Sequence, residues 1–211
     1  GRKGVGVNPL RGQNNVQGAA DMGCQPHQGA GYFEVADEKN QKFYTEKYGV
    51  IHPTKAGLKI PQMFEAAIDK KLKGLWIIGE DIVQTDPNSA HVVEAMNSLE
   101  LLVVQEIFMS ETAKLATVVL PGTTFLEKDG TFTNTERRIQ RVNRAVPPLP
   151  GTKPDGLIVT DMMQKLGFDQ PTYDADQVLE EIADIVPFFK GVTRERLGKL
   201  GLQWPVKEDG T

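Results

Sequence analysis

The chain has 211 residues, of which 39% are hydrophobic and 25% are charged. This composition is typical of a globular protein, and the length suffices for one domain of ordinary size or one domain with an appendage. The formal net charge is -4 and there is no long basic run, so electrostatic binding to nucleic acid or to an anionic membrane is not expected. No apolar run approaches the roughly 20 residues of a membrane span.

The N-terminus and the cysteine content bear on the cellular compartment. The chain starts with GRKGVG and has no apolar run behind it, so we expect no signal peptide. The absence of a starting methionine indicates an internal piece of a longer protein. Cys24 is the single cysteine, which excludes an internal disulfide and favours a reducing compartment. We therefore expect a cytoplasmic protein, with the periplasm as the alternative.

The first third of the chain changes from irregular to helical. Residues 1–33 are rich in Gly, Asn and Gln without a period, which predicts a loop with one short helical turn. The charged and aromatic stretch 37–48 predicts a surface helix. Residues 60–72 carry apolar side chains at the i, i+3, i+4 spacing, with Pro61 suited to a first turn, and this predicts an amphipathic helix.

Three short apolar runs at 75–79, 101–104 and 118–120 predict buried parallel strands. Between them we expect one helix with Asp86 as N-cap and Pro87 at its first position, and a short helix at 111–116. This alternation predicts an α/β fold, a Rossmann-like three-layer arrangement in which helices flank a parallel sheet. Ligands bind at the carboxyl ends of such strands, which are Gly79-Glu80-Asp81, Gln105-Glu106 and Pro121-Gly122-Thr123.

The character of the chain changes after residue 125. We expect a turn at 128–131, a basic cluster at Arg137, Arg138, Arg141 and Arg144, and a rigid connector rich in proline at 147–154. Apolar spacing predicts helices at 155–166 and 176–186. The predicted division is thus an irregular N-terminal loop segment (1–35), an α/β domain (36–124), and a connector with a helical C-terminal extension (125–211).

Four polar segments are candidates for ligand binding. Residues 9–18 (PLRGQNNVQG) combine one arginine, which suits a carboxylate or phosphate, with a row of amides; the alternative is a polar loop that caps a helix. The acidic loop 79–86 and the strand end 105–108 can contact a nucleotide, or be solvated and capping. Residues 131–140 can hold a polyanionic cofactor, or form a solvated surface. The three histidines share no metal-ligand spacing with Cys24.

Taken together, these segments resemble the catalytic (alpha) subunit of molybdopterin-dependent formate dehydrogenases. The resemblance rests on PLRGQNNVQGAADMG (9–23), IIGEDIVQTDPN (77–88), LLVVQEIFMSETAKLATVVLP (101–121), EKDGTFTNTERRIQRV (127–142) and GLQWPV (201–206). It covers nearly the whole chain in the correct order. Nitrate reductases and the large subunit of respiratory complex I share the strand and loop parts more loosely.

The resemblance implies oxidation of formate to carbon dioxide at a molybdenum or tungsten centre held by two pterin guanine dinucleotides. It also implies a 4Fe-4S cluster and a Cys or selenocysteine metal ligand, both in an upstream segment, and no metal ligand within this chain. The implied partners are the remaining domains of the same subunit, including a pterin-binding domain after residue 211, and electron-transfer subunits of the iron-sulfur or NAD-linked kind. We expect the isolated chain to be inactive.

The resemblance also implies roles for single residues. Arg11 matches the arginine that orients the formate carboxylate, and Gly12 and Gln13 would line the same pocket or touch a pterin. The residues implied around one guanosine, within the predicted domain 36–124, are Gly79, Glu80, Asp81, Thr85, Gln105, Glu106 and Ile107. Thr133 to Arg137 would lie near the pterin and on the side of the iron-sulfur cluster. The chain departs from the family pattern at Ala20, where Cys is frequent, and at Glu106 and Thr117, where Asp is common.

Two alternatives stay open. One is a pterin-binding or structural segment of another molybdopterin oxidoreductase, of the nitrate reductase or complex I type. Arg11 argues against a relative that has lost catalysis, because such a protein needs no arginine beside the metal. The other is a generic Rossmann-like nucleotide-binding module, but the GxGxxG loop of a NAD domain is missing.

Overall fold

The computed structural model describes residues 3–7, 10 and 12–207. The chain divides into two compact units. The first, here called the parallel-sheet unit, consists of residues 58–128 and 144–173. The second, called the antiparallel-sheet unit, is assembled from three separate stretches at 1–57, 129–143 and 174–211. Each unit has its own hydrophobic core.

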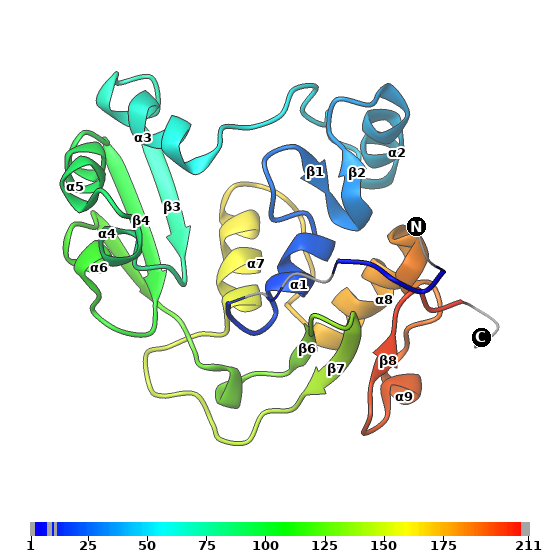
Figure 1. The fold of residues 1–211 in the computed structure, drawn as a ribbon. Coiled ribbons are helices and arrows are strands. Elements are labelled where there is room, and N and C mark those ends of the chain that lie inside the picture. Colours follow the sequence, from blue (N-terminus) through cyan, green and yellow to red (C-terminus); the bar gives the residue numbers. More distant parts are fainter. Residues whose placement is uncertain (1–2, 8–9, 11, 208–211) are drawn as a thin grey trace. The chain divides into compact units, whose positions relative to one another are not determined.

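The parallel-sheet unit alternates helices and strands as the sequence predicts (Figure 1). Its elements are α3 (Ile60–Ile68), β3 (Gly74–Ile78), α4 (Ile82–Thr85), α5 (Ser89–Asn97), β4 (Leu101–Glu106), α6 (Glu111–Lys114), β5 (Val118–Pro121), η2 (Phe125–Glu127) and α7 (Asp155–Lys165). The strands lie in the order β3-β4-β5 and are all parallel. The predicted parallel α/β sheet is therefore confirmed.

Apolar side chains from α3, α5 and β4 form the core of this unit. Phe64 and Ala67 of α3 pack with Val92 of α5 and with Leu102 and Val104 of β4. The strands are less buried than the sequence predicts, since Ile78 and Val118 are 49% and 42% exposed. The reason is that β3 and β5 are the two edges of a three-stranded sheet.

The predicted start of α5 is wrong by two residues. Asn88 is the N-cap, and its side chain accepts a hydrogen bond from the backbone N–H of His91 at 3.4 Å. Asp86 instead accepts from the backbone N–H of Asn88 at 2.9 Å, forming a turn before the helix. Asp and Asn favour such local bonds to the backbone, so either could have served as the cap.

The antiparallel-sheet unit contains a three-stranded sheet that the sequence analysis does not predict. Its order is β6-β7-β8, with β7 antiparallel to both neighbours. The elements of this unit are α1 (Val16–Asp21), β1 (Gln28–Gly29), η1 (Ala30–Tyr32), β2 (Phe33–Glu34), α2 (Glu38–Tyr48), β6 (Gly130–Thr133), β7 (Arg138–Val142), α8 (Ala175–Ile185), η3 (Pro187–Phe189), α9 (Arg194–Leu197) and β8 (Leu202–Gln203). The predicted turn at 128–131 thus ends at Gly130, where β6 begins.

Charged residues on β7 conceal its strand character in the sequence. Ile139 is fully buried, whereas Arg138 and Gln140 on either side point to the opposite face. Ile139 packs with Leu179 of α8, Phe189 and Leu197 in the core of this unit.

The helices predicted at 37–48, 155–166 and 176–186 are confirmed as α2, α7 and α8. No helix in the described part of the chain is long and apolar enough to cross a bilayer.

Candidate functional site

The carboxyl ends of the three parallel strands meet at one edge of the sheet. The backbone N–H of Gly79 donates to the carbonyl oxygen of Gln105 at 2.9 Å, and that of Gly122 donates to the carbonyl oxygen of Glu106 at 3.1 Å. The structure therefore brings the predicted residues at 79–81 and 105–107 together, beside Gly122 and Thr123. This edge is where open α/β sheets bind ligands.

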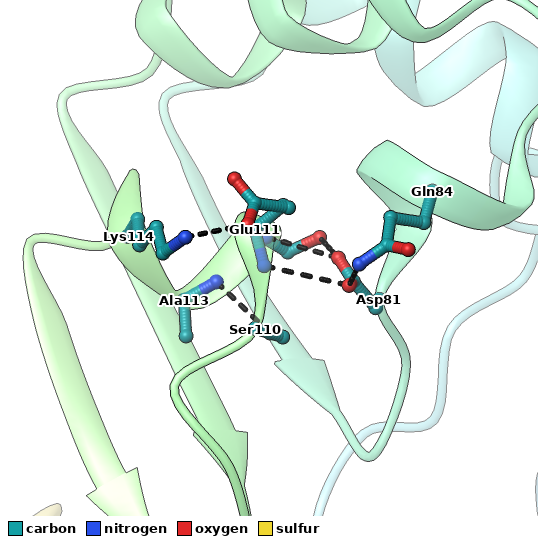
Figure 2. A network of polar contacts seen from close by, with 7 residues as sticks. Asp81, Gln84, Ser110, Glu111, Ala113 and Lys114 are labelled. Carbon is teal, nitrogen blue, oxygen red and sulfur yellow. Dashed lines mark hydrogen bonds and ion pairs between the residues drawn. The ribbon is translucent and has the colours of Figure 1, made fainter.

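Asp81 ties the loop after β3 to the start of α6 (Figure 2). One carboxylate oxygen accepts from the backbone N–H and the hydroxyl of Thr112, at 3.0 and 2.6 Å. The other accepts from the side-chain amide of Gln84 at 2.7 Å and from the backbone N–H of Glu111 at 3.4 Å. Burial raises the pKa of Asp81, but these hydrogen bonds outweigh it, and the pKa lies below its ordinary value. Both oxygens of Asp81 are thus engaged in hydrogen bonds that hold the loop after β3 against α6.

The other acidic side chains at this edge accept fewer hydrogen bonds than Asp81 does. Glu80 is exposed and accepts from the Thr85 hydroxyl at 2.5 Å through one oxygen. Glu106 accepts from the backbone N–H of Ile107 at 2.7 Å, also through one oxygen. Gly79 has φ 64°, a backbone conformation that side chains with a Cβ rarely adopt. This part of the edge offers carboxylate acceptors beside an uncrowded backbone.

Two buried polar atoms at this edge lack a partner among the residues that the structure describes. They are the side-chain oxygen of Gln105 and the hydroxyl of Thr123. The amide nitrogen of Gln105 donates to Asp155 at 2.6 Å, and Lys128 forms an ion pair with the same carboxylate. Leaving buried polar atoms unpaired is costly, so they fit a ligand that supplies hydrogen-bonding groups. Thr123 belongs to the strand end at 121–123 that the sequence places among the ligand-binding positions, but no individual role was predicted for it.

The antiparallel-sheet unit contains a cavity of about 350 Å³. Its lining is rich in amides and hydroxyls and consists of Gly12, Gln13, Asn14, Asn15, Val16, Gln17, Phe132, Thr133, Asn134, Thr135 and Gln140. The predicted residues Gly12, Gln13 and Thr133 therefore line one cavity. Arg11 lies outside the described residues. The alternation along β7 puts Gln140 on the cavity side, whereas Arg141 of the predicted basic cluster lies on the other face of the strand.

Asn15 fastens the cavity loop to β6. It has φ 58°, and its side-chain oxygen accepts from the backbone N–H of Thr133 at 2.9 Å. Gly18 leaves room for this arrangement, because a Cβ there would lie 2.2 Å from the same oxygen of Asn15. The amide row of residues 13–17 therefore lines the cavity and also holds its wall together.

Arg137 lies in the turn between β6 and β7. Its guanidinium carbon is 4.9 Å from the ring centroid of Trp204, a cation–π contact that holds an exposed cation against the ring. Its backbone has φ 64°, and its carbonyl oxygen accepts from the backbone N–H of Trp204 at 2.9 Å. Arg137 is thus an ordered positive charge on the turn that follows Thr133.

Comparison with known proteins assigns the chain to a family. The family model described as molybdopterin oxidoreductase matches residues 1–165. An F420-dependent formate dehydrogenase 1 subunit alpha of Methanococcus maripaludis is 46% identical over 98% of this chain and 31% of its own length. The chain belongs to the molybdopterin oxidoreductase family. It spans 31% or less of the length of the curated relatives described here.

Two further relatives of this molybdopterin oxidoreductase family member and one solved structure are also similar to the chain. An F420-dependent formate dehydrogenase subunit alpha of Methanocaldococcus jannaschii is 44% identical over 99% of this chain and 31% of its own. A probable oxidoreductase of Bacillus subtilis is 44% identical over 100% of this chain and 21% of its own. The structure of acetylene hydratase from Pelobacter acetylenicus aligns with TM-score 0.56 and 20% identity, covering 74% of this chain and 22% of that one. At this identity the last likeness concerns the fold alone.

The family implies a molybdenum or tungsten pterin cofactor, and the residues present fit its organic part. The unpaired oxygens of Gln105 and Thr123 suit a ligand with N–H or O–H donors. The cavity lining of Gln13, Asn14 and Asn134 offers both donors and acceptors. In contrast, the described residues contain no cluster of three or more His, Cys, Asp or Glu side chains that could hold a metal ion. Cys24 is a free, exposed thiol.

Proposed function

We propose that this chain is part of the catalytic subunit of a formate dehydrogenase, which oxidises formate to carbon dioxide and passes the electrons to an iron-sulfur cluster. The supporting observation is a cavity lined by amide side chains. One wall of this cavity is the loop that begins at Gly12, directly after Arg11 in the chain. The identity of about 45% to formate dehydrogenase alpha subunits over nearly the whole chain supports the same substrate. The isolated chain is proposed to be inactive.

Within this proposal, Arg11 binds the formate carboxylate. A guanidinium matches a carboxylate with two parallel N–H groups, which orients the substrate and offsets its charge. Gly12 and Gln13 border the substrate or a pterin, and Thr133 and Arg137 contact the pterin side. A molybdenum or tungsten ion with two pterin guanine dinucleotides supplies the two-electron oxidation chemistry when bound.

The edge of the parallel sheet is proposed to bind one guanosine. Gln105 and Thr123 offer unpaired oxygens, and Glu80 and Glu106 each keep a carboxylate oxygen that accepts no hydrogen bond within the described part of the chain. Gly79 and Ile107 border this surface through the loops after β3 and β4. Asp81 and Thr85 act indirectly, since Asp81 holds the loop against α6 and Thr85 donates to Glu80.

The deciding experiment uses the full-length protein that contains this chain. Its metal and pterin contents are measured, together with reduction of a dye by formate. We expect stoichiometric molybdenum or tungsten, bound pterin and formate-dependent reduction. Bound pterin without formate oxidation would indicate another oxidoreductase of the family, such as a nitrate reductase. Absence of both metal and pterin would indicate a non-catalytic relative of the complex I kind.

Arg11→Lys in the full-length enzyme tests the role of the arginine. Lysine keeps the charge but loses the planar pair of donors, so kcat/KM for formate should fall roughly 100-fold, the loss typical of a misplaced substrate. Arg194→Lys is the matched control, because Arg194 is half exposed and pairs with Asp176. Wild-type kcat and KM in Arg11→Lys would refute this role.

A further inference from the structure

A fully buried carboxylate lies at the end of α1 in the antiparallel-sheet unit. Asp21 is 0% exposed. One of its oxygens accepts from the side-chain amide of Gln17 at 2.8 Å and from the Tyr32 hydroxyl at 2.6 Å. The other accepts from the indole N–H of Trp204 at 3.0 Å. Gln17 lies on α1 together with Asp21, whereas Tyr32 lies in η1 and Trp204 lies after β8, so this side chain joins α1 to two other stretches of the chain.

The donors lead from Asp21 to one wall of the cavity and to the turn between β6 and β7. Gln17 lines the cavity, and its amide also donates to the Tyr32 hydroxyl at 2.9 Å. Trp204 carries the guanidinium of Arg137 on its ring and donates its backbone N–H to the carbonyl oxygen of Arg137. Asp21 is thus linked through Gln17 to the cavity lining, and through Trp204 to the turn between β6 and β7.

The backbone is strained at both ends of this network. Four described residues other than glycine have positive φ, namely Asn15, Tyr32, Lys70 and Arg137, with φ 58°, 62°, 59° and 64°. Tyr32 donates to Asp21, Arg137 lies on Trp204, and Asn15 lines the cavity, so three of the four belong to the network or the cavity wall. Strained residues persist only where the surroundings fix them, and they cluster at functional sites.

Stability alone does not account for a buried carboxylate with neutral donors. Burying a carboxylate costs free energy because the group loses its contact with water. A protein with well-packed apolar residues in its place is often as stable. A fully satisfied buried network does, however, fix the relative positions of its members. The observations therefore favour a network whose role is to fix the positions of the residues that it joins.

We infer that Asp21 is a positioning residue for the cavity. Through Gln17 it fixes α1 and the loop at residues 12–15, and through Trp204 it fixes Arg137. It does not touch the ligand itself. The inference rests on the proposed function for its link to formate, since Gly12 follows Arg11 in the chain, but the network is a property of the unit by itself.

The test is Asp21→Asn in the full-length enzyme, which keeps the size of the side chain and removes its charge. Amide hydrogen exchange should increase at residues 12–21 and 131–138 and stay unchanged in β3, β4 and β5. kcat/KM for formate should fall roughly 10- to 100-fold at unchanged pterin content, as for outer residues that orient a site. Asp174→Asn is the matched control, because Asp174 caps α8 outside the network.

Two milder variants keep the inference testable if Asp21→Asn does not fold. Trp204→Phe retains a ring under Arg137 and removes the indole donor, and Tyr32→Phe removes the hydroxyl. Each should loosen the same two segments to a smaller extent. Unchanged exchange, or increased exchange with wild-type kcat/KM, would overturn the inference. If the wild type oxidises no formate, the proposed function fails, while a selective increase in exchange at the two segments still supports the positioning role.

Discussion

At the scale of the residue, two buried threonines of the parallel-sheet unit differ in what their hydroxyls do. The hydroxyl of Thr112 donates to Asp81 at 2.6 Å and accepts from the backbone N–H of Val83 at 3.1 Å. The hydroxyl of Thr123 is buried without a partner in the described part of the chain. A buried hydroxyl without a partner destabilises the free protein, so its occurrence at a strand end indicates a site that a ligand completes.

Thr123→Val therefore has opposite expected effects with and without the cofactor. In the cofactor-free protein the variant should be as stable as the wild type or more stable by up to about 1 kcal/mol, because a desolvated hydroxyl is removed. In the loaded enzyme it should lower the pterin content. Thermal unfolding of the cofactor-free protein and pterin analysis of the loaded enzyme check the two effects.

Thr112→Val is the control for this pair of measurements. Its hydroxyl both donates and accepts a hydrogen bond, so the same change should destabilise the cofactor-free protein by roughly 1–3 kcal/mol. Equal destabilisation by both variants would contradict the assignment of Thr123 to a ligand.

Residue types indicated the site better than they indicated its internal bonds. The amide row at 12–17 and the strand ends at 79–81 and 105–107 stand out by composition and position, and the structure gathers each group within one unit. The burial of Asp21 is invisible in the sequence, because its donors Tyr32 and Trp204 are 11 and 183 residues away. Bonds at such separations depend on tertiary folding, which local patterns do not encode.

At the scale of the element, regular periodicity decided which parts were predictable. The helix α3 and the parallel strands show clear apolar spacing, and their presence was predicted correctly, although α3 ends at Ile68 and not at residue 72. The strand β7 has the sequence RIQRV, in which the one buried residue, Ile139, lies between Arg138 and Gln140. Its partner β6 lies just before it in the chain, but β8 begins 60 residues after the end of β7. Neither a hairpin signal nor an apolar run therefore revealed the whole sheet.

The short helix α6 gives a prediction on pH. Asp81 accepts hydrogen bonds from Thr112 and Glu111 at its start, and the pKa of Asp81 lies below its ordinary value of 3.8. A carboxyl group whose pKa is lower in the folded state stabilises the fold above its unfolded pKa, and this contribution is lost as pH falls through the folded pKa. Protection of the α6 amides should therefore decrease as the pH falls below 3.8.

Hydrogen exchange of α6 against pH measures this effect, with Asp81→Asn as the comparison. The variant cannot titrate at position 81, so its α6 protection should be lower near neutral pH and should change less over the acid range. Parallel curves for the two proteins would show that Asp81 does not stabilise the start of α6 through its charge.

At the scale of the whole molecule, the two units have separate cores formed from different stretches of the chain. Leu102 is 2% exposed in the core of the parallel-sheet unit, and Ile139 is 0% exposed in that of the antiparallel-sheet unit. The second core joins residues from the segment 129–143 to residues beyond 174, so its formation closes a long loop that contains α7. Such a core forms only when distant segments meet, whereas the first is built mainly from neighbouring elements.

Separate cores predict that a cavity made in one unit leaves the other protected. Leu102→Ala and Ile139→Ala should each cost about 2–5 kcal/mol, the range for removing a buried Leu or Ile side chain. Leu102→Ala should raise amide exchange in β3, β4 and β5, and Ile139→Ala in β6, β7 and α8, each with little effect on the other set. Leu166→Ala, at a position 69% exposed, is the control and should change neither set. Equal loss of protection in both sets from either core variant would show that the chain unfolds as one cooperative body.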